Sequence, residues 1–164
     1  MRPLVDLGVK LGAVTFLALA PVSITLAQDS GAASPEEAAQ KAVELRQSLF
    51  RLIGYSFGPV GGMLKNKVPF DAAVAAKSAQ RLETLAPMIN EVFNEDTRKF
   101  QLKTKAREGI WTNKSDFQAK ADDLVKASAA LSAAAKGGDK KAVMQAAAAV
   151  GKACGACHDN FRDK

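Results

Sequence analysis

Apolar residues recur at steps of three and four over most of the chain after residue 34, which is the spacing of one face of an α-helix. The sequence Ser34-Pro35-Glu36-Glu37 combines a capping box with a proline at the first helical position, so we expect a helix to begin there. Pro59 and the glycines around it predict a kink or an end of this helix between residues 57 and 61. The apolar stripe consists of Ala39, Val43, Leu49, Phe50, Ile53, Phe57 and Val60.

Two further helices are predicted on either side of a loop. Asp71 can cap a second helix that continues to about Phe93. Residues 94–103 are charged and follow neither the helical nor the strand pattern, so we expect a loop there. Thr104 is a candidate cap for a third, alanine-rich helix, and Gly137-Gly138 marks its end.

A fourth helix is predicted from Lys140 to about Phe161, with Asp139 as its cap. No stretch alternates between apolar and polar residues as a half-buried strand would. Four amphipathic helices with short or modest connections indicate an all-α protein, a four-helix bundle. Periodicity alone leaves the topology of the bundle open.

The N-terminus is typical of an export signal. Residues 11–20 are apolar, but Pro21 interrupts them before they are long enough to span a bilayer comfortably. Small residues at the positions that a signal peptidase reads predict cleavage after Ala27. We therefore expect a signal peptide over residues 1–27 and a mature bundle over residues 28–164, with an uncleaved membrane anchor as the alternative.

The charge distribution does not favour nucleic acid as a partner. The 164 residues include 23 Lys and Arg against 17 Asp and Glu, a net charge of +6. The basic residues are dispersed, and aromatic residues do not alternate with them as a base-stacking surface requires. We expect no nucleic-acid partner and, after processing, no membrane association.

Both cysteines and the only histidine of the chain lie in Cys154-Gly155-Ala156-Cys157-His158, near the C-terminus. Two thiols followed directly by an imidazole at this spacing form the c-type haem attachment signal. On a helix, Cys157 and His158 project to the same side as Cys154. We therefore predict one covalent haem c per chain, with thioether bonds to Cys154 and Cys157 and with His158 as an axial ligand of the iron.

A zinc site, a redox pair and a structural disulfide are the other interpretations of this motif, and each fits it less well. A zinc site would need carboxylate ligands besides the one histidine and two cysteines. A thioredoxin-like redox pair would follow a strand, and no strand pattern precedes Cys154. A disulfide between Cys154 and Cys157 would close too short a loop to add much stability.

The motif and the leader point to the same compartment. Haem attachment needs reduced thiols and takes place outside the bacterial cytoplasm in the systems that use this signal. Because the two features are independent in the sequence, we expect a periplasmic protein.

A haem motif on the last helix of an exported four-helix bundle with a single histidine resembles the class II c-type cytochromes, and within them the cytochrome c′ family. The resemblance extends over residues 34–164. It is strongest at residues 150–162, weaker at residues 46–50, and supported by Ile110-Trp111 and Phe117. It implies an antiparallel bundle with the haem near one end, usually as a homodimer formed through the first two helices.

The resemblance also implies two residues near the haem. Arg46 matches an arginine that lies near a propionate, and Phe50, one helical turn later, matches the residue that covers the distal face. A phenyl ring has no lone pair for iron and no hydrogen-bond donor. We therefore expect five-coordinate, high-spin haem that binds NO and CO by displacing the ring and holds O2 poorly. Packing of Phe50 in the core, with no role at the haem, is the alternative.

Low-spin relatives carry a ligating methionine at the position of Phe50, so a methionine as sixth ligand is the alternative haem state. The methionines that remain after processing are Met63, Met88 and Met144. The resemblance brings neither Met88 nor Met144 to the iron, and Met63 lies several turns from Phe50.

On the proximal side, Arg162 stands four residues after His158 and would share its side on a continued helix. A basic residue near the proximal pocket is a feature of the family that the chain resembles. A solvated arginine near a helix C-terminus is the alternative.

Two functions fit these expectations. One is a gas-binding protein that carries or scavenges NO, and the other is an electron-transfer protein that exchanges electrons with redox partner proteins. We do not expect an enzyme, because the only histidine is committed to iron and the predicted distal wall offers no acid–base group.

Overall fold

The computed structural model describes residues 33–164, so the predicted signal peptide lies outside the described residues. This part of the chain is helical and contains no strand, and Ala106 and Arg162 form an isolated bridge within it. The helices are α1 (Pro35–Leu64), α2 (Ala72–Leu85), α3 (Met88–Val92), α4 (Gly109–Thr112), α5 (Lys114–Gly137) and α6 (Lys140–Phe161). The predicted all-α class is confirmed.

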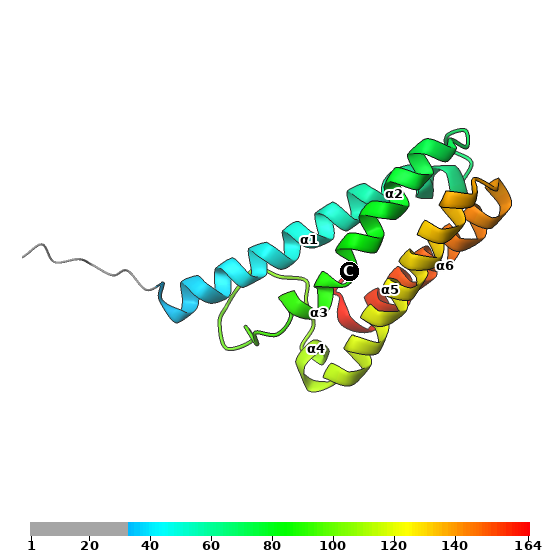
Figure 1. Ribbon diagram of the computed structural model, residues 1–164. Coiled ribbons are helices and arrows are strands. Elements are labelled where there is room, and N and C mark those ends of the chain that lie inside the picture. The colour runs from blue at the N-terminus through cyan, green and yellow to red at the C-terminus, as the bar shows by residue number, and fades with distance from the viewer. Residues whose placement is uncertain (1–32) are drawn as a thin grey trace, which may run out of the picture. The chain divides into compact units, whose positions relative to one another are not determined.

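The four long helices form an antiparallel bundle in which α1 and α5 each pack against both α2 and α6 (Figure 1). The α1–α2 and α5–α6 turns lie together at one end of the bundle. The other end contains α3, α4, the end of α6 and the connection between α3 and α4, which we call the long loop (residues 93–108). This arrangement confirms the predicted four-helix bundle.

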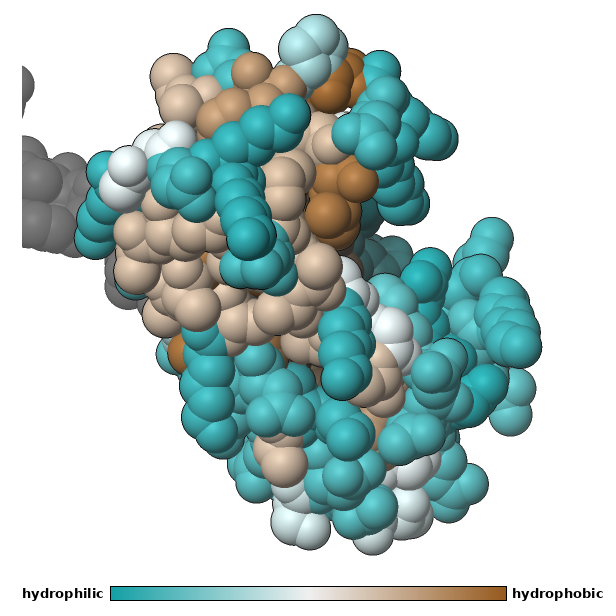
Figure 2. Space-filling model, turned by 90° about the vertical axis from the view of Figure 1, so that its right-hand side faces the viewer, coloured by the Kyte–Doolittle hydropathy of each residue, from teal (hydrophilic) through white to brown (hydrophobic). Residues whose placement is uncertain are grey.

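The interior of the bundle is aliphatic. Its largest fully buried apolar side chains are Leu82, Leu131, Val43, Val60, Val143 and Val150. Each such side chain stabilises the fold by about 1.5–3 kcal/mol relative to an exposed one. On the face of the molecule in Figure 2, a broad, mildly hydrophobic area (tan) is bordered by long hydrophilic side chains (teal). Smaller, strongly hydrophobic areas (brown) lie beside it.

The start of α1 agrees with the prediction, and its end lies beyond residue 61. The backbone N–H of Glu37 donates to Ser34 Oγ at 3.2 Å, and the N–H of Ser34 donates to Glu37 Oε2 at 2.7 Å, which completes the capping box. The prediction for residues 57–61 was a kink or an end, and the helix does not end there but continues through Pro59 to Leu64. An interior proline costs about 3 kcal/mol. Burial of Val60 and Met63 beyond it offsets that cost.

The second predicted helix is divided in two. Asp71 caps α2 as expected, because its Oδ1 accepts from the N–H of Val74 at 2.9 Å. The helix ends at Leu85, and α3 begins after Pro87, which lacks the N–H needed to continue the ladder.

Thr104 does not cap a helix, and this prediction was wrong. Its Oγ1 accepts from the N–H of Ala106 two residues later, at 3.1 Å, which is a local turn. The chain stays non-helical here because Lys105 and Arg107 form backbone hydrogen bonds with the C-terminal residues, at 2.9 and 3.0 Å. Regular helix resumes at α4 and α5.

The turn between α5 and α6 follows the prediction. α5 ends at Gly137, and Gly138 adopts the left-handed conformation with φ of 70°. Asp139 then caps α6 by accepting from the N–H of Ala142 at 2.7 Å, and α6 continues to Phe161. The motif Cys154 to His158 therefore lies on the last turns of α6.

Candidate haem site

Cys154 and Cys157 are half-buried on α6, pack against the hydrophobic core, and are not joined by a disulfide. Burial raises the pKa of both thiols, and for Cys157 to about 11, with the neighbouring Cys154 charge adding to the effect. Neutral thiols resist oxidation, since the thiolate is the reactive form. The two cysteines are therefore present as free thiols, the form that thioether attachment requires.

A zinc site is also not supported. Between residues 33 and 164, no group of three or more His, Cys, Asp or Glu side chains is placed to hold a metal ion. The donors of the motif are two soft thiols and one imidazole, which is the set that covalent haem attachment uses.

His158 follows Cys157 directly and is exposed at the surface, yet its environment favours the neutral imidazole. Burial lowers the pKa of His158, and the positive charge of Arg162 adds to this while Asp159 opposes it. A neutral imidazole has a nitrogen lone pair for a metal. The backbone carbonyl of His158 accepts from the N–H of Arg162 at 3.2 Å, which closes the last turn of the helix.

An aromatic cluster, defined as Phe50, Phe93, Trp111, Phe117 and Phe161, joins α1 to the end of α6. The ring centroids of Phe50 and Phe93 are 6.1 Å apart, those of Phe93 and Phe117 are 4.9 Å apart, and those of Phe117 and Phe161 are 5.4 Å apart. Trp111 lies 6.2 Å from Phe93. Edge and tilted contacts of this kind hold rings in fixed orientations. The cluster connects the predicted distal residue to the helix that carries His158.

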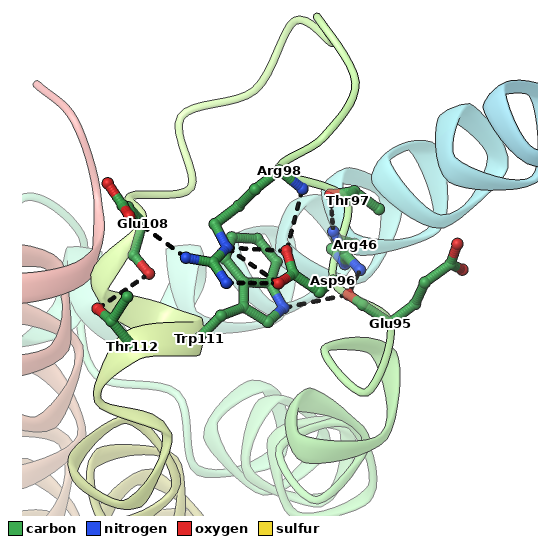
Figure 3. A network of polar contacts seen from close by, with 8 residues as sticks. All are labelled: Arg46, Glu95, Asp96, Thr97, Arg98, Glu108, Trp111 and Thr112. Atoms are coloured by element: carbon green, nitrogen blue, oxygen red, sulfur yellow. Dashed lines mark hydrogen bonds and ion pairs between the residues drawn. The ribbon is translucent and has the colours of Figure 1, made fainter.

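Arg46 is 3% exposed and lies against the start of the long loop (Figure 3). Its Nε donates to the carbonyl of Val92 at 2.7 Å, Nη1 to Thr97 Oγ1 at 2.9 Å, and Nη2 to the carbonyl of Glu95 at 2.6 Å. Burial lowers the pKa of Arg46, and the charges of Glu95 and Asp96 oppose this. A guanidinium has five N–H donors, and three are used here. Contact with a propionate stays the predicted role of Arg46.

Trp111 lies between two arginines in the same network (Figure 3). The guanidinium carbons of Arg46 and Arg98 lie 5.4 and 5.9 Å from the centroid of its ring, and its Nε1 donates to the carbonyl of Glu95 at 3.1 Å. Arg98 in turn pairs with Asp96 at 2.6 Å and with Glu108 at 3.3 Å. These contacts fold the start of the long loop onto α1 and α4.

Arg162 does not lie on a continued helix, so that premise was wrong. α6 ends at Phe161, and Arg162 has extended backbone with φ of −129° and ψ of 133°. Burial is the main cause of the lowered pKa of His158, and the positive charge of Arg162 adds to it. A role for Arg162 on the proximal side remains a prediction.

Several residues of this region have no local signal in the sequence. Phe93 was expected only as the end of a helix, yet it is the centre of the aromatic cluster. Thr97 lies in the stretch predicted as a loop, and Arg107 lies at the start of the predicted third helix, where the structure has no helix. The partners of both residues lie far away in the sequence. Periodicity cannot identify such contacts, because they depend on how the loop is laid across the bundle.

A helical bundle whose last helix presents two free thiols and an adjacent imidazole on one side is the architecture of a c-type cytochrome. The family model described as Cytochrome C′ matches residues 41–162. The chain belongs to the cytochrome c′ family.

Individual relatives agree with this assignment. The chain is 39% identical over 123 residues to cytochrome c′ of Rubrivivax gelatinosus, covering 75% of this chain and 95% of the relative. It is 32% identical over 166 residues to cytochrome c-554 of a Cereibacter sphaeroides strain, covering 100% of this chain and 99% of the relative. Family members are haem proteins of electron transfer or gas binding, and the family implies a covalent haem c.

Solved structures show the same fold. Cytochrome c prime from Shewanella frigidimarina superposes with a TM-score of 0.72 at 39% identity, covering 77% of this chain and 97% of that one. A nitric oxide complex of a leucine-to-alanine variant of cytochrome c prime from Alcaligenes xylosoxidans superposes with a TM-score of 0.69 at 32% identity, covering 77% and 96%.

Proposed function

We propose that this protein is a periplasmic cytochrome with one five-coordinate, high-spin haem c that binds NO and CO, exchanges electrons with redox partner proteins, or does both. The haem would be held through Cys154 and Cys157, with His158 on its iron, and would supply the site for gas binding and electron exchange. Phe50 would cover the distal face, Arg46 would contact a propionate, and no catalytic turnover is assigned. The observation that carries the proposal is the fixed position of Phe50 in the aromatic cluster.

The positions of the methionines support an open sixth site over the low-spin alternative. Met63 lies about 20 Å along α1 from Phe50, given the rise of an α-helix. Met144 lies about 21 Å along α6 from His158 by the same measure. Met88 is 39% exposed on α3. Met63 and Met144 would therefore need a large rearrangement to place a sulfur over an iron that His158 binds.

Absorption and EPR spectra of the purified protein test the proposal. Ferric and ferrous spectra, each with and without CO and NO, should show a high-spin haem that changes on addition of gas. A low-spin ferric spectrum that CO does not alter in the ferrous state would instead establish the methionine-ligated alternative. Mass spectrometry of the mature protein from its native host should find one covalent haem, and its absence would refute the proposal entirely.

Gas binding and electron transfer are distinguished by comparing the affinity for NO with the rate of reduction by a redox protein. The nitric oxide complex of the Alcaligenes xylosoxidans relative supports gas binding for this chain too. Binding of NO at low concentration, with slow reduction by periplasmic redox proteins of the host, would favour a carrier or scavenger. Fast reduction by such a protein, with weak NO binding, would favour electron transfer.

The compartment can be tested separately. None of the helices between residues 33 and 164 is both long and apolar enough to cross a membrane. N-terminal sequencing of the protein from a periplasmic extract should begin at Gln28. A start at Met1 in a membrane fraction would establish the uncleaved anchor.

A homodimer through α1 and α2 is part of the proposal. Leu45, Leu52 and Tyr55 are 58%, 53% and 69% exposed, and their spacing places them along one side of α1. On α2, Arg81 lies over the ring of Tyr55 at 5.6 Å, so both helices border this surface. Exposed apolar side chains in a row are a typical feature of an interface between subunits.

A further inference from the structure

The C-terminal end of α6 is capped by a residue from the long loop. An α-helix leaves its last four carbonyl groups without partners in the helix, here those of residues 158–161. The first of them accepts from Arg162, and the other three accept from Arg107. Arg107 Nη1 donates to the carbonyl of Asp159 at 2.9 Å and of Asn160 at 3.5 Å, and its backbone N–H donates to the carbonyl of Phe161 at 3.0 Å.

A second set of contacts fixes Arg107 itself. Its Nε donates to Asp163 Oδ1 at 2.9 Å, and the N–H of Asp163 donates to the carbonyl of Lys105 at 2.9 Å. The two short segments, residues 105–107 and 161–163, are therefore joined by both backbone and side-chain bonds. The guanidinium also places a positive charge at the negative end of the helix dipole.

This cap matters because the histidine of the motif lies in the turn that it closes. His158 immediately precedes Asp159, whose carbonyl receives the shortest bond from the guanidinium. Helix ends usually fray by one or two residues. If the last turn of α6 opened, the backbone that orients the imidazole would move with it. A metal ligand in such a place needs support from outside its own helix.

We propose that Arg107 is the positioning residue of the axial ligand: by capping α6 it holds the turn of His158, and therefore the imidazole, in one orientation toward the haem iron. The inference rests on the proposed function, since it takes His158 as the ligand. It adds that a loop residue distant in sequence controls the iron–histidine bond. The positive charge of Arg107 on this side of the haem also favours the reduced state.

The test compares Arg107→Gln with three further variants of the haem-loaded protein. Arg107→Gln removes the guanidinium and its bonds to two carbonyls. Asp163→Asn removes the ionic partner of Arg107 but leaves those bonds in place, and Arg98→Gln removes an arginine from the same loop that does not contact α6. The readouts are the iron–histidine stretching band of the ferrous protein in resonance Raman spectra, the midpoint potential, and hydrogen exchange of the amides at Arg162 and Asp163.

For Arg107→Gln we expect a shifted or broadened iron–histidine band, a lower midpoint potential, and amide exchange faster by about tenfold or more, as expected for a frayed terminus. Asp163→Asn and Arg98→Gln should keep the band of the wild-type protein. Arg107→Lys should restore the potential more than the band, because an ammonium keeps the charge but not the planar set of donors.

Two outcomes would contradict the inference. Unchanged amide exchange in Arg107→Gln would show that Arg107 does not hold the last turn. Faster exchange with an unchanged band and potential would show that it stabilises the helix without positioning the ligand. A wild-type protein without a haem adduct is a different failure, because it would refute the proposed function before any variant is compared.

Discussion

Phe50 is the side chain whose identity separates an open sixth site from a methionine-ligated one. It is half-buried and its ring is tilted by 58° against that of Phe93, so its position on α1 is fixed by packing. Phe50→Met should place a flexible thioether at the same point and convert the high-spin spectrum toward a low-spin one. The exchange of one large apolar side chain for another should cost less than about 1.5 kcal/mol of stability. Absorption and EPR spectra of the ferric variant measure the outcome.

Leu52→Met is the matched control, because Leu52 lies on the same helix but is 53% exposed. It should leave the haem spectrum unchanged. If Phe50→Met also leaves it unchanged while the variant remains folded, Phe50 does not lie over the iron and its role is restricted to core packing.

Asp96 makes a small, pH-dependent contribution to stability. Hydrogen bonds from Arg98 lower the pKa of Asp96 below its ordinary value of 3.8 in the folded protein. The carboxylate therefore stabilises the fold above that pH, and the contribution is lost as the pH falls through the lowered pKa. Asp96 and Arg98 are 43% and 36% exposed, so solvent screening limits the effect to less than about 1 kcal/mol.

Thermal unfolding of Asp96→Asn at pH values above and below 3.8 tests this contribution. Above pH 3.8 the variant should be less stable than the wild-type protein. The difference in stability should shrink as the pH falls below the lowered pKa of Asp96. Salt should reduce the difference as well. A constant difference at every pH would show that the destabilisation does not come from the charge.

The turn between α5 and α6 contains two adjacent glycines with different requirements. Gly138 has φ of 70°, where a side chain is strained, whereas Gly137 is the last helical residue of α5. A Cβ atom at either position would meet no other atom within 4 Å. Gly138→Ala should therefore destabilise the protein by about 1 kcal/mol through backbone strain alone. Gly137→Ala should be neutral or stabilise it by up to about 0.5 kcal/mol.

Chemical denaturation of the two variants measures this pair directly, since each serves as the control of the other. Equal losses of stability in both would argue against the left-handed conformation at Gly138. The turn lies at the opposite end of the bundle from the motif on α6, so both variants should keep the spectrum of the wild-type protein.

Much of the fold could be predicted because its signals are local. Ser34, Asp71 and Asp139 each act as helix caps within three residues of their partners, so the sequence is sufficient to place them. Thr104 looked equally suitable, but the neighbouring backbone pairs with the end of the chain, which no local pattern reveals. Likewise, α1 continues through Pro59 because of burial against other helices, a tertiary effect that outweighs propensity.

In the candidate site too, the features that depend on neighbouring residues could be predicted from the sequence, and the long-range contacts could not. The motif Cys154 to His158 is contiguous, and helical spacing alone brings its donors to one side. The expected contact of Arg46 came from resemblance. The structure adds two bonds to the long loop and one to the end of α3, which the sequence could not indicate. Arg107 lies 52 residues before Asp159, and only the folded bundle brings them together.

At the scale of the whole molecule, the exposed apolar side of α1 predicts self-association. Leu45, Leu52 and Tyr55 are more than half exposed, although apolar residues elsewhere on α1 are buried. Leu52→Glu would place a carboxylate in the centre of an interface between two copies, where it would lose its hydration without gaining a partner. We expect the dissociation constant of the dimer to rise by at least about tenfold, which corresponds to about 1.4 kcal/mol. Sedimentation velocity over a range of concentrations measures the change.

Val68→Glu is the matched control, because Val68 is 48% exposed but lies in the turn after α1 instead of on this side of it. It should leave the dimer intact. Both variants should also keep the haem spectrum, since the motif lies on α6 and the substituted side chains face solvent. A wild-type protein that remains monomeric at every concentration would refute the homodimer without affecting the proposed haem ligands.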